Sequence, residues 1–115
     1  MEHRVAFLDV FAERPLAGFL AYSVAKSGLA GLTRALALEL APEVRVNGVS
    51  PGAILWPEGG EQYSGEERAR IVRQTPLQRE GTPADVAGAV KYLLLDAPYV
   101  TGQILSVDGG REITL

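Results

Sequence analysis

Residues 21–26, with the sequence AYSVAK, open a helical pattern that continues to about Leu40. Tyr22 and Lys26 are four positions apart, which places them about one turn apart on the same face of a helix. An ammonium group beside a partly buried phenol favours the phenolate and lowers the pKa of the tyrosine, which suits a general acid or base. The alternative is an ordinary amphipathic helix that carries a tyrosine and a lysine near its start. The same face continues with residues that we expect to be buried, namely Leu29, Thr33, Leu36 and Leu40.

The helix has a second apolar face, built largely from small side chains. Two glycines on it lower the intrinsic helix propensity by up to about 1 kcal/mol each relative to alanine, which indicates a packing reason for them. We expect this face to pack on a neighbouring helix of the same chain or to form a subunit interface across a two-fold axis. Its members are Ala21, Val24, Ala25, Gly28, Gly31, Leu32, Ala35 and Leu38.

The rest of the chain alternates between strand and helix patterns. Pro42 ends the long helix, because the residue before a proline is disfavoured in the α region. Thr82 is the predicted N-cap of a later helix that starts at Pro83, with a buried face of Val86, Val90, Leu93 and Leu94. The predicted order is a strand at 4–10, the helix to about 40, a strand at 44–50, helices at 65–74 and 83–95, and a strand at 103–107. Such alternation predicts an α/β fold with a parallel sheet and right-handed crossovers.

The composition excludes several classes of protein. The 115 residues suit one domain, 1–115, and the net charge of −3 offers no basic surface for nucleic acid or anionic lipid. No apolar run approaches the roughly 20 residues of a membrane span, and the first residues lack the apolar core of a signal peptide. With no cysteine and one histidine, disulfides, thiol catalysis and a metal site of several histidines are excluded. We expect a cytoplasmic protein without a bound metal.

Five short motifs carry a family resemblance. In order they are YSVAK at 22–26, RVNGVSPG at 45–52, REGTPAD at 79–85, TGQ at 101–103 and VDGG at 107–110. Together they resemble the carboxyl-terminal landmarks of the short-chain dehydrogenase/reductases, with a catalytic Tyr-x-x-x-Lys motif. The resemblance implies a Rossmann-like fold, here a partial doubly wound parallel sheet, and a homo-oligomer that packs through the 22–40 helix.

Asp9 points to one subgroup of that family. It stands thirteen positions before Tyr22, where most members have serine and the pteridine reductases have aspartate. Those enzymes reduce dihydropterins and dihydrofolate with NADPH. The resemblance implies that Tyr22 delivers or relays a proton, that Lys26 holds the nicotinamide ribose, and that Asp9 assists protonation of the pterin. The alternative for Asp9 is a residue at a strand end that caps the next loop.

The turn after the strand at 44–50 is a second candidate site. By resemblance Pro51, Gly52, Ala53 and Ile54 contact the nicotinamide amide, and a glycine there lets the backbone approach a flat ligand. Trp56 either stacks on a pterin at the substrate mouth or packs within its loop. We expect Asn47 to have a structural role. By resemblance, Arg79 and Asp85 fix a loop and start a helix.

The sequence contains no Gly-x-Gly-x-x-Gly turn between a strand and a helix, the usual cradle for a dinucleotide pyrophosphate. We therefore expect the carboxyl-terminal half of a reductase domain, which in isolation oligomerises, aggregates or stays loosely packed and binds NADPH poorly. Three functions stay open. They are a pteridine reductase impaired by truncation, an inactive fragment or interaction module, and a reductase of another carbonyl or imine.

Overall fold

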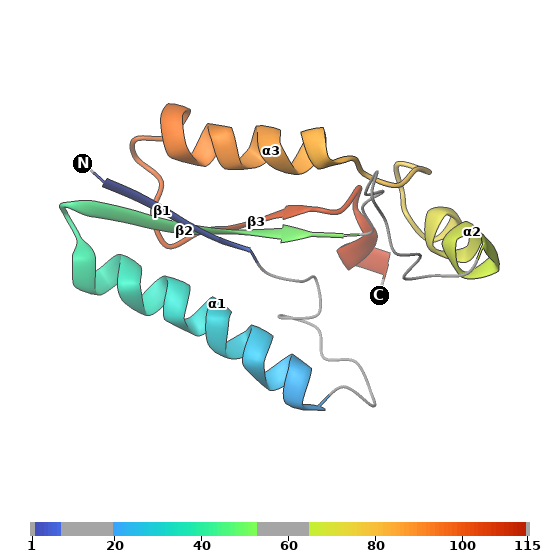
Figure 1. Ribbon diagram of the computed structural model, residues 1–115, viewed down its shortest axis with the longest axis horizontal. Coiled ribbons are helices and arrows are strands. Elements are labelled where there is room, and N and C mark those ends of the chain that lie inside the picture. Colours follow the sequence, from blue (N-terminus) through green and yellow to red (C-terminus); the bar gives the residue numbers. More distant parts are fainter. Residues whose placement is uncertain (1, 8–19, 53–64, 115) are drawn as a thin grey trace.

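The computed structural model describes residues 2–7, 20–52 and 65–114, and for residues 2–7 and Tyr22 it describes the backbone alone. A three-stranded parallel sheet lies between two helices, with α1 (Leu20–Leu40) on one face and α3 (Pro83–Lys91) on the other (Figure 1). This architecture confirms the predicted α/β class and the parallel sheet. Among the described helices, none is long and apolar enough to cross a bilayer.

The strands follow the order β1 (Glu2–Phe7), β2 (Val44–Pro51) and β3 (Ile104–Val107). β1 starts two residues before the predicted Arg4, because its register sets Glu2 opposite Val44, the first residue of β2. The apolar run from Val5 marks only the part of the strand with apolar side chains, and the polar start is fixed by pairing.

β2 is the central strand and is buried along six consecutive residues, 45–50. Its polar side chains are therefore buried too, and those of Arg45 and Asn47 bond to the segment before β3. Asn47 donates from Nδ2 to the Val100 carbonyl at 2.9 Å and accepts the Gln103 N–H at 3.0 Å. The structural reading of Asn47 is confirmed.

Pro51 belongs to the end of β2, although the predicted strand ended at residue 50 and placed Pro51 in the following turn. It pairs with Val107, and the next N–H, from Gly52, donates to the Val107 carbonyl at 3.0 Å. A proline is tolerated here because the neighbouring glycine supplies the donor that the proline lacks.

The buried stripe of α1 differs from the predicted one. Leu36 and Leu40 are exposed by 36% and 38%, whereas the side chains against the sheet are small. A helix closes on a sheet more tightly through small side chains, which a pattern of large apolar residues does not reveal. Thr33 is buried as predicted, and Lys26 and Leu29 are half-buried. The buried residues of the stripe are Ser23, Ala30, Thr33 and Ala37.

The helix that starts at Pro83 changes form before it ends. The predicted N-cap Thr82 is confirmed by a reciprocal capping box with Asp85. Its last part, Tyr92–Asp96, is a π-helix that the sequence did not predict. Buried Arg45 of β2 donates to two carbonyls in the π-helix, those of Leu93 and Leu94, and to those of Ala97 and Val100 just after it, at 2.6–3.2 Å. The predicted buried face holds, since Val86 and Leu93 are buried and Val90 and Leu94 are half-buried.

Two shorter elements flank the carboxyl ends of the strands. α2 (Gly65–Arg73) ends one residue before the prediction, and a 3₁₀ turn, η3 (Arg111–Thr114), closes the described chain. The Asp108 carboxylate accepts the N–H groups of Gly110 and Glu112, both at 2.9 Å, and so starts η3.

Candidate active site

The carboxyl ends of the strands and the start of α1 lie at the same end of the molecule (Figure 1). A helix that connects two parallel strands runs back along the sheet, so its first turn returns to the edge where the previous strand ended. Ligands of open α/β sheets bind at this edge. The fold therefore carries the Tyr22–Lys26 end of α1 and the Pro51–Gly52 end of β2 to the expected edge.

The first turns of α1 hold the predicted catalytic pair. Tyr22 and Lys26 both belong to the continuous helix Leu20–Leu40, one turn apart. Lys26 is half-buried, and Ser23 beside Tyr22 is 5% exposed. The Ser23 hydroxyl makes no hydrogen bond to any described residue. The sequence did not single out Ser23, whose burial depends on the rotation of α1 against the sheet.

Gly52 ends β2 in close contact with another strand end. A Cβ on Gly52 would lie 2.7 Å from the Asp108 Cβ and 2.9 Å from the Asp108 Cα. The sequence interpretation assigned this glycine to close approach of a ligand, but the backbone after β3 already requires it. Asp108 is thus a neighbour of the candidate site that motif spacing missed, since it lies 56 positions downstream.

Four predicted site residues lie outside the described residues, namely Asp9, Ala53, Ile54 and Trp56. Their roles stay predictions. A cavity of about 510 Å³ is lined by the end of β3, the turn that follows at Asp108 and the segment before α3. None of the predicted catalytic or binding residues lines it. Its polar lining comes from Arg79, Asp85, Ser106 and Asp108.

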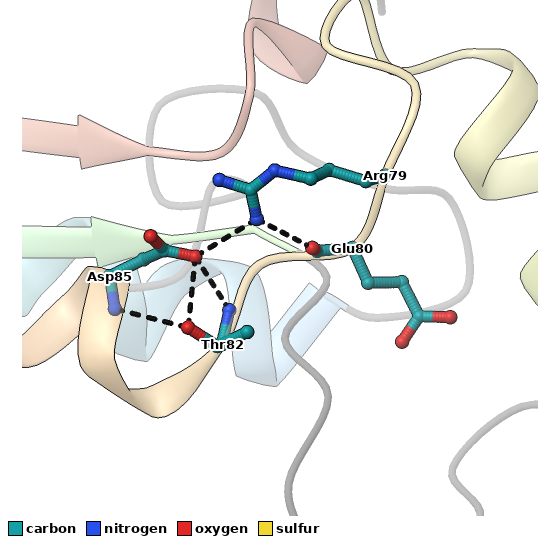
Figure 2. Close-up of polar contacts among 4 residues, drawn as sticks. All are labelled: Arg79, Glu80, Thr82 and Asp85. Atoms are coloured by element: carbon teal, nitrogen blue, oxygen red, sulfur yellow. Dashed lines mark hydrogen bonds and ion pairs between the residues drawn. The ribbon is translucent and has the colours of Figure 1, made fainter.

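Arg79 and Asp85 form a structural cluster at the start of α3 (Figure 2). Arg79 Nη1 donates to Asp85 Oδ2 at 3.1 Å, and the Thr82 N–H donates to the same oxygen at 2.8 Å. The hydrogen bond from Arg79, followed by those from Thr82, lowers the pKa of Asp85 to about 2. This arrangement confirms that the pair fixes a loop and starts a helix.

The described residues fit only part of a dinucleotide. Half-buried Lys26 is a cation that could bond to ribose hydroxyls, whereas the Gly52 backbone already packs against Asp108. The sequence offers no Gly-rich turn for the pyrophosphate. Among the described residues, no group of three or more His, Cys, Asp or Glu side chains could hold a metal ion.

Comparison with known proteins assigns the family. Residues 5–112 match the family model described as enoyl-(acyl carrier protein) reductase. The chain is 46% identical over 95 residues to an uncharacterized oxidoreductase of Mycobacterium tuberculosis, 46% over 100 to carbonyl reductase family member 4 of Danio rerio, and 42% over 113 to pteridine reductase 1 of Leishmania tarentolae. These matches cover 81%, 86% and 96% of this chain. They span only 36–40% of the relatives' own length.

Solved structures give the same result. The aldohexose dehydrogenase of Thermoplasma acidophilum superposes with a TM-score of 0.86 at 33% identity, over 96% of this chain and 48% of that one. A short-chain dehydrogenase/reductase of Serratia marcescens superposes with a TM-score of 0.82 at 32% identity, over 96% and 45%. On the family model, these relatives and the shared fold, the chain belongs to the short-chain dehydrogenase/reductase family.

Proposed function

We propose that this chain supplies the catalytic tyrosine and lysine of an NAD(P)H-dependent oxidoreductase. The observation that carries the proposal is the position of Tyr22 and Lys26 in the first turns of one continuous helix, beside the carboxyl edge of a parallel sheet. Ligands of this fold bind at that edge. The half-burial of Lys26 supports a positioned cation in place of a fully solvated one.

The proposed chemistry divides a reduction into two transfers. The nicotinamide cofactor, when bound, supplies a hydride to the carbon of a C=N or C=O bond. The Tyr22 phenol supplies the proton to the nitrogen or oxygen, which balances the charge of the hydride. Lys26 stabilises the phenolate that remains and holds the ribose. In this proposal Pro51, Gly52, Ala53 and Ile54 contact the nicotinamide.

For the substrate we propose a dihydropterin or dihydrofolate, with NADPH as the reductant. Asp9 would assist protonation of the pterin and Trp56 would stack on it. The likeness to the Leishmania pteridine reductase over 96% of the chain supports this choice. The likeness to the carbonyl reductase, 46% identical over 100 residues, supports a second candidate, reduction of another carbonyl or imine.

We further propose that residues 1–115 form one partial Rossmann-like domain, in a cytoplasmic protein. The chain matches only 36% of the length of the first relative, and its sequence contains no Gly-rich turn. Both observations support a partial domain. An incomplete cofactor site would leave the chain impaired by itself. An inactive fragment or interaction module is the alternative outcome.

The proposal is tested by titrating the purified chain with NADPH, followed by fluorescence, with dihydrobiopterin added as substrate. We expect Tyr22→Phe to abolish any turnover, because the phenyl ring has no proton to give. Tyr92→Phe, at a side chain that is 48% exposed on the π-helix, is the matched control and should leave turnover unchanged. Turnover that survives Tyr22→Phe refutes the catalytic assignment, and a lack of NADPH binding supports the inactive alternative.

We also propose self-association through α1. All eight residues of the predicted small-residue face are exposed, and a Cβ on Gly28 or Gly31 would meet nothing within 4 Å. Leu38 is 83% exposed on this face, so Leu38→Glu should shift the chain toward monomer in sedimentation velocity. Ile113→Glu is the control, since Ile113 is 82% exposed on η3. An unchanged sedimentation profile for Leu38→Glu would refute this interface.

A further inference from the structure

α2 is a short helix with most of its residues exposed. Of its nine residues only Ile71 is buried, and α2 stands beside the sheet and its two covering helices at the carboxyl end of the strands (Figure 1). A helix with so few buried side chains opens locally at a low free-energy cost. Its position therefore depends on the contacts at its two ends.

The carboxyl-terminal end of α2 is firmly attached. Thr75, which is 4% exposed, donates to the Ile71 carbonyl at 2.7 Å, and the Leu77 N–H donates to the Gly109 carbonyl at 3.1 Å. Gln78 lies in the left-handed region with a φ of 57°. Its side-chain amide donates to three carbonyls at this helix end, those of Val72, Arg73 and Thr75, at 2.8–3.4 Å. A positive φ is rare for a residue with a side chain, and here the side-chain amide of the same residue donates to the end of α2. Together these features define the backbone turn about which α2 would move.

The first half of α2 is attached by an ion pair. Arg68 Nε donates to Glu80 Oε1 at 2.9 Å, and Nη2 donates to Oε2 at 3.4 Å. The two side chains are 39% and 18% exposed. A two-point contact of this kind fixes orientation as well as distance.

Hydrogen bonds hold the backbone at the Glu80 end of this pair. The Glu80 backbone carbonyl accepts Arg79 Nη1 at 3.0 Å, and the same nitrogen holds Asp85 in the capping box of α3. The Glu80 carboxylate points away from that cluster (Figure 2), which leaves it directed to Arg68. The ion pair thus joins α2 to the start of α3 across 12 residues of chain.

We propose that the Arg68–Glu80 ion pair is a salt-sensitive latch that holds α2 against the start of α3. When the pair breaks, α2 loosens from its first turn while the turn at 74–78 keeps its other end in place.

The test is hydrogen exchange of the full chain by mass spectrometry, with Glu80→Gln as the variant and Glu66→Gln as the control. Glu66 is an exposed carboxylate in the first turn of the same helix. We expect Glu80→Gln to speed exchange in α2 about two- to five-fold, the effect of losing one partly exposed ion pair, with β2 unchanged. In about 1 M salt, where the Debye length falls to about 3 Å, the unsubstituted chain should approach the variant.

Three results would overturn the latch. They are unchanged exchange in α2, equal acceleration in α2 and β2, and a difference that persists in full at high salt. None of them depends on cofactor binding or turnover, so failure of the latch is distinguishable from failure of the proposed function.

Discussion

Gly52→Ala tests whether the end of β2 is shaped by the protein itself or by a ligand. The added Cβ would lie 2.7 Å from the Asp108 Cβ and 2.9 Å from the Asp108 Cα. Carbon atoms in good contact are about 3.5–4.0 Å apart, so one strand end must move by about 1 Å. Both atoms belong to the backbone or its first side-chain carbon, so rotation of a side chain offers no escape.

The expected change in the free energy of unfolding combines two costs and one gain. Overpacking of this kind costs about 1–3 kcal/mol, and the Gly52 N–H bond to the Val107 carbonyl, now 3.0 Å, would weaken, at a cost of about 1 kcal/mol. The lower entropy of the unfolded alanine chain returns about 0.4–1 kcal/mol. We therefore expect Gly52→Ala to lower the free energy of unfolding by about 2 kcal/mol, a large part of the roughly 5–15 kcal/mol of a typical domain.

The assay is urea unfolding without any ligand, followed by circular dichroism, with Gly88→Ala as the matched control. Gly88 lies within α3, and a Cβ there would meet nothing within 4 Å. That substitution should leave the stability unchanged or raise it by up to about 1 kcal/mol. If Gly52→Ala is as stable as Gly88→Ala, the contact with Asp108 does not constrain the turn, and the reasoning is refuted.

Three further substitutions test contacts that the fold creates. Asp85→Asn should lower the melting temperature at neutral pH, because the folded pKa of about 2 lies below the ordinary 3.8; the carboxylate stabilises the fold above 3.8, and the difference should vanish as the pH falls toward 2. Arg45→Met removes a donor from the carbonyls of Leu93, Leu94, Ala97 and Val100, of which the last two keep a second donor, and should cost about 3 kcal/mol in urea unfolding. Asn47→Asp sets a carboxylate against the Val100 carbonyl at a site that is 1% exposed, and should cost about 3 kcal/mol in the same assay.

The element order and the helix ends followed from local rules. The helix that starts in AYSVAK was predicted within one residue at its start, and Thr82 with Pro83 marked the start of α3. These signals depend on neighbours three or four positions away, so they are readable without a tertiary structure. The π-helix at Tyr92–Asp96 could not be predicted from the local sequence, because the Arg45 that bonds to its carbonyls lies 48 or more positions upstream.

The candidate site divides in the same way. The Tyr-x-x-x-Lys spacing and the glycine after a strand singled out Tyr22, Lys26 and Gly52, and the fold carries all three to one end of the molecule. Asp108 was not linked to Gly52, since a contact between two strand ends depends on sheet register. The roles assigned to Asp9, Ala53, Ile54 and Trp56 stay predictions.

The sequence by itself determined the α/β class and the order of the elements, because periodicity, capping and turn residues act over a few positions. Its five motifs pointed to the family by resemblance. The tertiary structure decided which face of α1 is buried, since a helix settles on a sheet through Ser23, Ala30, Thr33 and Ala37 and leaves larger leucines outside. It also decided the partners of Arg45, Gly52 and Glu80. Those contacts join segments 12 to 56 positions apart, and only the packing of strands and helices brings such segments together.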